Sequence, residues 1–410
     1  MDRELILINI NGEDRAGLTA ELMEILARYK ADVMDIGQAD IHHNLSLGIL
    51  FKTDSHKSGD IIKELLIKTN DLKVQVNFNI VSEDEYNRWV GRQGKTRYII
   101  TILGRKITAE QIADTAKVIA TQGLNIDSIT RLTGRIPLDE SQQPLTKACI
   151  QFSVRGNPSN LQQMQADLMS LSRRLNYDIS LQEDTIYRRS RRLICFDMDS
   201  TLIRTEVIDE LADKAGVGRE VRAITEAAMR GEIDFKESFT RRVALLKGLD
   251  VSVMKDIAEN LPITEGLEWL MEVLKRSGYK TAILSGGFTY FGNYLKQKYG
   301  FDYVYANELE VGPDGKLTGR YLGDIVDGQR KKELLRLLAQ VENINIAQTI
   351  AVGDGANDLP MLSEAGLGIA FHAKPKVKAE AGQSISTIGI DGVLYFLGFK
   401  DSYITPGDRQ

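Results

Sequence analysis

Along the first 85 residues, stretches in which apolar positions have the spacing of a strand alternate with stretches in which they have the spacing of a helix. Short apolar runs and one stretch of alternating residues predict four strands, at about residues 5–10, 33–36, 45–51 and 74–78. Apolar residues recur at helical spacing between them and predict two helices, at about residues 18–26 and 61–66. The order strand–helix–strand–strand–helix–strand is that of a ferredoxin-like fold, so residues 1–85 are expected to form one such module.

Residues 95–185 repeat this order. Strands are predicted at about residues 98–103, 124–129, 148–154 and 179–181, and helices after Thr108 and over residues 160–175. The similarity to the first module lies in the order of the elements more than in identical residues. It indicates an internal duplication.

A different pattern begins near residue 190 and continues to about residue 400. Short apolar runs alternate there with helical patterns, which predicts an α/β domain with a Rossmann-like parallel sheet. Residues 206–262 separate the first two of its strands and are rich in helix formers. We expect them to form a small helical cap that closes over a site and excludes water.

Composition narrows the classes of function. The chain has 410 residues and a net charge of −5, which gives no general reason to expect nucleic acid as a partner. Its one basic run, residues 188–192, is interpreted as a solvated linker. No apolar run approaches the roughly 18 residues that span a membrane. The first residues lack the layout of a signal peptide, so a cytoplasmic protein is expected.

Reactive side chains follow the predicted strands of the third segment. Asp197 and Asp199 come directly after one apolar run. Ser285 and Asp354 follow two other runs, and Lys331 lies near the start of a predicted helix. Because ligands of parallel sheets bind beyond the carboxyl ends of the strands, these groups are expected at one edge of the sheet.

This set of groups suits phosphoryl transfer. Asp197 and Asp354 are suitable ligands for Mg²⁺, which prefers oxygen ligands and offsets the charge of a phosphate dianion. Lys331 and the hydroxyl of Ser285 could hold the phosphate oxygens. Asp199 is placed to protonate the leaving alkoxide and then to activate water. Asp197 would then be the nucleophile and form an aspartyl-phosphate.

The same motifs resemble those of the haloacid dehalogenase superfamily. Asp197-x-Asp199-x-Thr201, Ser285, Lys331 and Gly353-Asp354-Gly355-x-Asn357-Asp358 occur in the family's order. The resemblance implies that Asp197 is both nucleophile and metal ligand. It implies that Asp199 is the acid/base and binds metal through its backbone carbonyl, and that Asp354 completes the metal site.

Other motif positions are assigned around this centre. Substrate contacts are expected from Ser285, Gly286 and Asn357, and supporting roles from Thr201 and Asp358. The lysine of the motif is taken as Lys331 rather than the adjacent Lys332, on the spacing of the family. The alternative for Asp197 and Asp199 is a calcium-binding or purely structural loop.

Charged residues of the expected cap indicate which phosphate ester is bound. Glu206 can pair with an ammonium group, and Arg242 can hold a carboxylate in bidentate fashion, although the adjacent Arg241 is an alternative. Together they describe an α-amino acid that carries a phosphate. Ordinary surface charge is the other interpretation of these residues.

The segments 197–206 and 235–243 are similar to phosphoserine phosphatases. The resemblance implies that Glu206, Phe235 and Arg242 contact the substrate's amine, side chain and carboxylate. The expected reaction is hydrolysis of O-phospho-L-serine to L-serine and phosphate, the last step of serine biosynthesis. Transfer of the phosphoryl group to another alcohol, such as homoserine, would need the same residues. A third hypothesis is an amino-acid-sensing regulator with a degenerate phosphatase domain.

The two N-terminal modules resemble ACT domains, which commonly bind amino acids. The first carries the family's loop Asp14-Arg15-Ala16-Gly17-Leu18, whereas the second has Gly104-Arg105-Lys106-Ile107-Thr108 at that position. We expect L-serine to bind as an effector at an interface of a homodimer. Amides near Gly12 and Gly17 would hold its carboxylate, and Asp35 its ammonium. The alternative is that both modules only mediate dimerisation.

Overall fold

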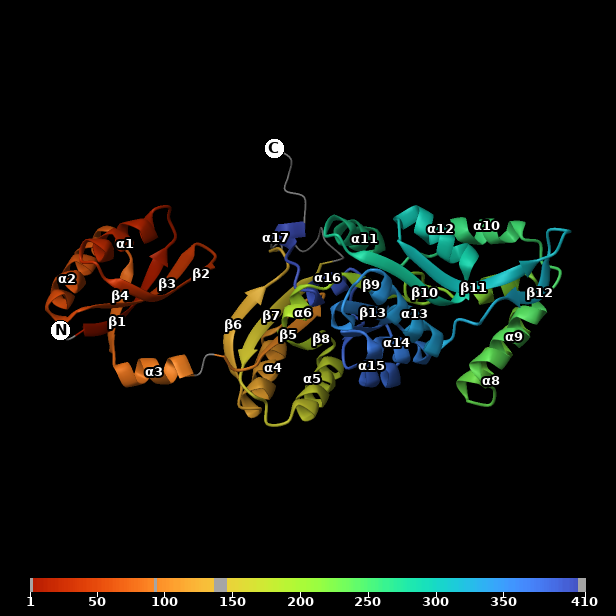
Figure 1. Ribbon diagram of the computed structural model, residues 1–410, viewed down its shortest axis with the longest axis horizontal. Helices are drawn as coiled ribbons and strands as arrows, with labels where there is room; N and C mark the ends of the chain where they lie inside the picture. The colour runs from red at the N-terminus through yellow and green to blue at the C-terminus, as the bar shows by residue number, and fades with distance from the viewer. Residues whose placement is uncertain (1–2, 92–93, 136–145, 405–410) are drawn as a thin grey trace. The chain divides into compact units, whose positions relative to one another are not determined.

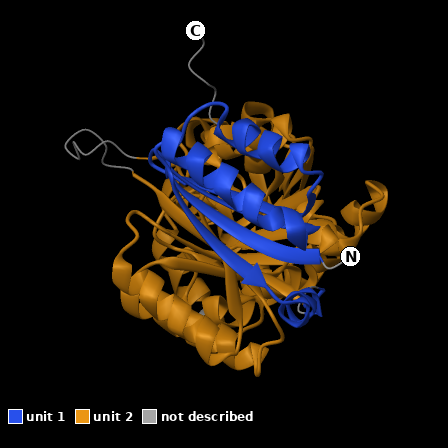
Figure 2. Cartoon of the chain, turned by 90° about the vertical axis from the view of Figure 1, so that its left-hand side faces the viewer, with its two compact units in different colours: residues 1–95 blue, residues 96–410 orange. Residues whose placement is uncertain are grey.

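A computed structural model describes residues 3–91, 94–135 and 146–404 of the chain. The chain divides into two compact units, residues 1–95 and 96–410 (Figure 2). Each unit has buried apolar cores of its own. Within the described ranges, no helix is both long enough and apolar enough to cross a membrane.

The first unit is a ferredoxin-like module followed by a helix. Its elements are β1 (Arg3–Glu13), α1 (Leu18–Arg28), β2 (Asp32–Ile41), β3 (Asn44–Asp54), α2 (Ser55–Asp71), β4 (Gln75–Val81) and α3 (Glu83–Gly91). The strands form an antiparallel sheet in the order β2-β3-β1-β4 (Figure 1). Leu22 of α1 and Leu65 of α2 pack with Ile8 of β1 in one core. The predicted order of elements is therefore confirmed, and α3 is an addition that the pattern did not predict.

The second unit begins with the second module. Its elements are β5 (Arg97–Gly104), α4 (Ala109–Thr121), β6 (Asn125–Arg131), β7 (Ala148–Arg155), α5 (Leu161–Leu175) and β8 (Asp178–Glu183). The sheet order β8-β5-β7-β6 places fourth, first, third and second strands side by side, as in the first module. Thr108 and Gln111 form a capping box at the start of α4. The two modules predicted as a duplication therefore share the same order of strands in their sheets.

A largely parallel sheet follows in the same unit. Its strands are β9 (Leu193–Phe196), β10 (Lys280–Phe288), β11 (Tyr303–Val311), β12 (Leu317–Leu322), β13 (Thr349–Gly353), β14 (Leu367–Phe371) and β15 (Ser384–Ile385). They lie in the order β12-β11-β10-β9-β13-β14-β15, with β12 antiparallel to β11. The predicted Rossmann-like arrangement is confirmed, with a mixed edge.

Helices cover both faces of this sheet. On one face lie α11 (Leu267–Arg276) and α12 (Thr289–Tyr299), and on the other α13 (Gly328–Val341), α14 (Leu359–Glu364) and α15 (Pro375–Ala381) (Figure 1). Ile194 and Phe196 of β9 pack into the core beneath α11 and α12, and Leu193 and Cys195 pack into the core beneath α13, α14 and α15. This alternation explains why β9 is an uninterrupted apolar run, because both faces of a parallel strand are buried.

The second module and the parallel sheet share one sheet and one core. Ser384 of β15 pairs with Ile179 of β8, and this bridge joins both parts into a continuous 11-stranded sheet. Leu103 and Cys149 of the module belong to the same apolar cluster as Val393 of α16 (Gly392–Phe396). A bridge this short leaves no periodic signal, which explains why the sequence pattern did not predict it.

The basic run at the junction corrects one expectation. Residues 188–192 were interpreted as a solvated linker, but the side chain of Arg188 is only 8% exposed and lies 3.7 Å from Asp184. Arg191 is buried and donates a 2.7 Å hydrogen bond to Gln182. Arg189 and Arg192 are exposed, so the expectation is wrong only for Arg188 and Arg191, which lie against Asp184 and Gln182 at the end of the second module.

The segment expected to form a cap is helical. It comprises α7 (Val207–Lys214), α8 (Gly218–Met229), α9 (Phe235–Leu245) and α10 (Ser252–Glu259). The chain enters and leaves it through a short antiparallel connection in which Ile203 pairs with Ile263. The apolar side chains Leu211 and Phe239 join the main core of the unit. The boundaries expected for the cap and for the three domains remain predictions.

Candidate active site

The sheet order brings three reactive segments to one edge. Strand β9 lies between β10 and β13 and pairs in parallel with both. The chain passes from β9 to one side and later returns to the other, which makes the crevice beyond these strands a topological switch point. Asp197 follows β9, Ser285 lies in β10, and Asp354 follows β13. The structure thus places these residues at a position where α/β sheets bind ligands.

Lys331 lies underneath this edge. Its ammonium group donates to Asp197 Oδ1 and to Asp358 Oδ1, each at 2.6 Å, and its side chain has no exposed surface. Burial alone would lower the pKa of Lys331, but the two carboxylates outweigh burial and raise it. Lys332 instead lies near the surface, 3.2 Å from Glu364. The structure therefore brings Lys331, and not Lys332, to the site.

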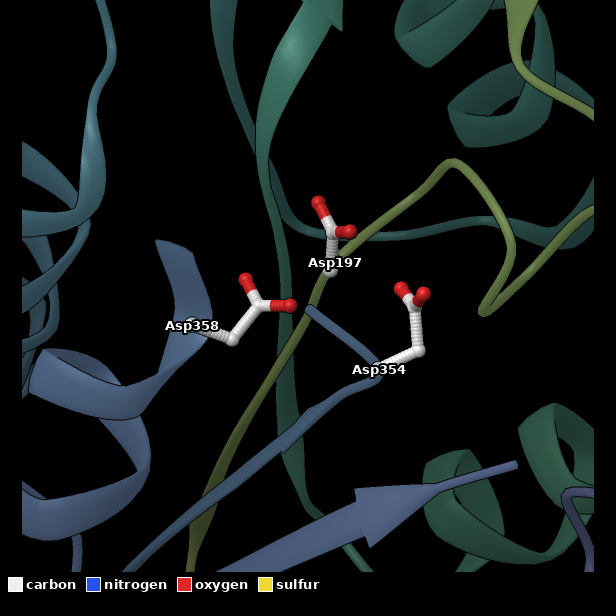
Figure 3. Close-up of side chains that lie close together, drawn as sticks. All are labelled: Asp197, Asp354 and Asp358. Atoms are coloured by element: carbon white, nitrogen blue, oxygen red, sulfur yellow. The ribbon is translucent and has the colours of Figure 1, made fainter. Parts of the chain in front are cut away.

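The carboxylates of Asp197, Asp354 and Asp358 lie together at this edge of the sheet (Figure 3). One oxygen from each of Asp197, Asp354 and Asp358 lies within 4.8 Å of the others. Burial and the charge of Asp358 raise the pKa of Asp197 well above its ordinary value, and they raise the pKa of Asp354 to about 7. Like charges held this close favour a bound cation, so the group fits a metal with oxygen ligands.

Asp358 has fewer free lone pairs than the other two. One of its oxygens accepts from Lys331, and the other accepts from the amide of Gly355 at 2.9 Å. Asp354 accepts one hydrogen bond, of 3.3 Å, from the hydroxyl of Thr201. Asp197 and Asp354 are thus the carboxylates better placed to take a metal, and Asp358 and Thr201 lie beside them.

Asp199 lies on the tight loop after β9. Its Oδ1 accepts from the amide of Val207 at 3.2 Å, which ties it to the start of α7. A Cβ on Gly287 would come within 2.5 Å of the other carboxylate oxygen, so the site requires glycine there. Burial and the neighbouring Glu206 raise the pKa of Asp199, which favours its protonated form.

Gly286 and Gly287 lie on the opposite wall, and Ser285 is buried directly before them in β10. The buried hydroxyl of Ser285 accepts from the amide of Gly287 at 2.9 Å, which leaves its proton available for a ligand. The carbonyl of Gly286 accepts from Asn307 at 2.7 Å, and the same side chain accepts from the amide of Val326. Asn307 therefore fixes this wall. The sequence reasoning missed it, although a polar residue within a strand was a possible signal.

A cavity of about 800 Å³ opens above these groups, between the strand ends and the cap. Asp197, Asp199, Gly286, Asp354 and Asn357 line it from the sheet. From the cap, the lining includes Glu206, Phe235 and Arg242. One cavity thus contains most of the residues expected at the phosphate end and those expected to bind an amino acid, whereas Ser285 and Lys331 are fully buried and are not part of its lining.

The two candidate arginines point to different environments. Arg241 pairs with Glu237 on the surface, 2.5 Å away, and its side chain is 56% exposed. Arg242 lines the cavity, and burial lowers its pKa while Glu206 and Asp209 oppose that shift. The structure therefore brings Arg242, and not Arg241, to the site. Asp209 also lines the cavity and was missed, because one acidic residue on a helix is ordinary surface composition.

The residues expected to bind an effector do not all meet in the first unit. Gly17 has a φ of 92° and begins α1, so it provides the tight turn of the loop. Gly12 lies opposite Leu45 of β3, whereas Asp35 lies opposite Leu50. Five residues of strand separate these positions, which is about 16 Å. A single copy of the module therefore does not place Asp35 beside Gly12.

Comparisons with known proteins agree with this site. The pattern of haloacid dehalogenase-like hydrolases matches residues 194–363, and ACT-domain patterns match residues 4–79 and 96–182. A solved HAD family hydrolase of Salmonella enterica shares 31% identity and superimposes with a TM-score of 0.62. The match covers 76% of this chain and 100% of that protein. Fold and site thus define a haloacid dehalogenase-like hydrolase with two ACT domains.

Relatives of full length narrow this class. A phosphoserine phosphatase of Streptomyces coelicolor is 39% identical over 99% of this chain and 95% of its own length. A phosphoserine phosphatase of Mycobacterium tuberculosis is 37% identical, over 98% of this chain and 95% of its own. The chain belongs to the phosphoserine phosphatase family. This confirms both resemblances seen in the sequence.

Proposed function

We propose that the chain hydrolyses O-phospho-L-serine to L-serine and phosphate through a phosphoaspartyl intermediate. The observation that carries this proposal is the shared cavity, in which Arg242 and Glu206 of the cap face Asp197 and Asp199. An amino acid that carries a phosphate needs all four groups within reach. The full-length similarity to phosphoserine phosphatases supports the same substrate.

Asp197 acts as the nucleophile in the first step. Lys331 holds Asp197 Oδ1, so the other oxygen attacks phosphorus, and the bond between phosphorus and the serine oxygen breaks. Asp199 gives its proton to that oxygen, because an alkoxide is a poor leaving group. Ser285, the amide of Gly286 and the amide of Asn357 are available for the phosphoryl oxygens.

Asp199 acts as a base in the second step. As a carboxylate it takes a proton from water, whose oxygen attacks phosphorus, and the bond to Asp197 breaks to release phosphate. The protein regains its starting state, with a proton on Asp199. The hydrogen bond from Val207 keeps Asp199 oriented in both steps.

Mg²⁺ fits the carboxylate group. Asp197, Asp354 and the backbone carbonyl of Asp199 would hold it, since small oxygen ligands suit this ion. When bound, Mg²⁺ offsets the repulsion between the phosphate dianion and the attacking carboxylate. Asp358 orients Lys331, and Thr201 orients Asp354.

The cap recognises the amino-acid end. Arg242 binds the carboxylate, Glu206 binds the ammonium, and Phe235 packs against the substrate's methylene. In the free protein Ser200 donates to Glu206 at 2.9 Å, which holds that carboxylate in place. A Cβ built on Gly286 would lie 3.2 Å from the Phe235 ring, so the ring closes the cavity directly above the phosphate wall.

Phosphate release from phosphoserine with Mg²⁺ tests this function. EDTA is expected to abolish the release and excess Mg²⁺ to restore it. Phosphoethanolamine, which lacks the carboxylate, should be a poor substrate. Homoserine added to the assay separates hydrolysis from phosphotransfer, because transfer would yield phosphohomoserine in place of free phosphate. No release from phosphoserine would contradict the proposal and favour a regulator with an inactive phosphatase domain.

We also propose that the protein is a homodimer with L-serine as an effector. Strand β2 is exposed along its length and carries Val33, Met34 and Ile36, an apolar edge of the kind that pairs with a second chain. Because one copy separates Gly12 from Asp35, the serine site would combine the loop at Gly17 with Asp35 from two copies. A cytoplasmic location stays a prediction.

A further inference from the structure

The second module differs from the first in the loop after its first strand. In the first module this loop contains Asp14 to Gly17, the expected effector position. In the second module it contains Arg105, which donates to both oxygens of Glu265, at 2.9 and 2.7 Å. The two side chains are 33% and 36% exposed. Both hydrogen bonds come from the same nitrogen, Nη2, so the contact joins the two opposite charges at one point.

Glu265 lies where the chain returns from the cap to the sheet. The two preceding residues pair with the outgoing chain: Ile263 bridges Ile203, and the amide of Thr264 donates to Leu202 at 3.0 Å. The hydroxyl of Thr264 donates to the carbonyl of Thr201 at 2.7 Å. Both ends of the cap thus meet in one short antiparallel connection, directly next to Glu265.

This connection leads to the catalytic loop. Thr201, which accepts from Thr264, donates to the Asp354 carboxylate at 3.3 Å. The cap begins a few residues later with Glu206. A shift of the connection would therefore move the amino-acid end of the cavity relative to the phosphate end.

A second contact from the module reinforces the first. Lys147 forms an ion pair with Asp391, whose side chain is buried. Asp391 lies directly against Gly266, and the amide of Ile390 donates to the carbonyl of Glu265 at 2.8 Å. The hydrogen bond from Arg105 also lowers the pKa of Glu265, so the pair stays charged over the neutral range. The module therefore holds both sides of the segment that follows Thr264.

We propose that Arg105 is a positioning residue for the reaction: through Glu265 it fixes the connection of the cap, so that Arg242 and Glu206 face the phosphate end of the cavity. This deepens the proposed function and rests on it. The loop that the first module offers to an effector is, in the second module, used to hold the cap. This difference in role explains why the two modules differ in the loop after their first strand.

Arg105→Gln tests the proposal, with Lys106→Gln as its matched control, because Lys106 is adjacent and exposed. In Arg105→Gln the KM for phosphoserine should rise about two- to fivefold, the range for a partly exposed ion pair. The kcat, and the hydrolysis of an aryl phosphate without an amino-acid end, should stay near the wild-type values. Glu265→Gln should have the same effect, and the double variant no larger one, because both act through one contact.

Hydrogen exchange gives a readout that does not depend on the substrate. Backbone amides of residues 201–206 and 261–266 should exchange faster in Arg105→Gln than in Lys106→Gln. Arg105→Lys, which keeps the charge on a shorter and differently shaped side chain, should lie between wild type and Arg105→Gln in both measurements. Unchanged exchange in Arg105→Gln, or effects of the two single variants that add in the double variant, would overturn the proposal. If wild type leaves phosphoserine intact, the proposed function fails, and the exchange data still decide whether Arg105 holds the connection.

Discussion

The ammonium group of Lys331 lies 2.6 Å from the carboxylate of Asp197, and both side chains are buried. One oxygen of Asp197 is thereby occupied and the other is directed toward the cavity. A buried cation next to the attacking carboxylate also reduces its repulsion from a phosphate dianion. The pair thus contributes both to the stability of the site and to its chemistry.

Lys331→Met should remove both contributions. Phosphoserine hydrolysis should fall about 100-fold or more, as expected when a group that stabilises the transition state is lost. Without Mg²⁺ the free energy of unfolding should fall by about 3–5 kcal/mol, because Asp197 and Asp358 lose their shared cation. Lys332→Met is the matched control and should cost less than about 1 kcal/mol. Equal effects of the two substitutions, by urea unfolding and phosphate release, would refute this role of Lys331.

Asp197→Asn should abolish the reaction while the fold persists. The amide keeps the shape of the side chain but lacks the charge that attacks phosphorus, so turnover should fall by about four orders of magnitude or more. Asp324→Asn, an exposed position, is the control and should be neutral. Single-turnover assays with labelled phosphoserine should show a phosphoprotein in wild type and in Asp324→Asn, but not in Asp197→Asn. A phosphorylated Asp197→Asn protein would place the nucleophile elsewhere.

Arg242→Ala should harm recognition of the amino acid more than the chemistry. Loss of a half-buried partner of the substrate carboxylate should lower kcat/KM for phosphoserine by about 30-fold or more. An aryl phosphate has no carboxylate to lose, so its hydrolysis should change little. Arg241→Ala removes only a surface pair with Glu237 and should stay within about twofold of wild type. Parallel losses on both substrates would show that Arg242 supports the phosphate end or the fold.

The sequence predicted best what depends on short segments. β9 is an apolar run that Asp197 follows directly, so its place at the carboxyl end of a parallel strand was predicted from the sequence. The bridge between Ser384 and Ile179 and the pair Arg105–Glu265 were not predicted. Each depends on two residues far apart in the chain, with no periodicity to mark either. Asn307 was missed for a related reason, because its role depends on two backbone groups that only the folded chain brings together.

Regulation by L-serine is the last prediction, and plain product inhibition at the active site is its rival. If L-serine binds between two copies of the first module, Asp35→Ala should raise the concentration that inhibits by about fivefold or more, the lower limit of a typical coupling between sites. The proposed contact is an ion pair between the Asp35 carboxylate and the ammonium group of L-serine. Because Asp35 is exposed on β2, loss of its side chain should leave the fold and the basal activity unchanged.

The control for this prediction is Asp60→Ala, an exposed substitution on α2. L-serine should inhibit Asp60→Ala as strongly as it inhibits wild type. Phosphate should inhibit Asp35→Ala and Asp60→Ala as strongly as it inhibits wild type. Product inhibition at the active site would be competitive with phosphoserine and identical in all three proteins. Sedimentation with and without L-serine supplies a second measurement, because a site shared by two copies stabilises the dimer in wild type and not in Asp35→Ala. Unchanged potency in Asp35→Ala would refute the effector site at this position and leave the first module with assembly alone.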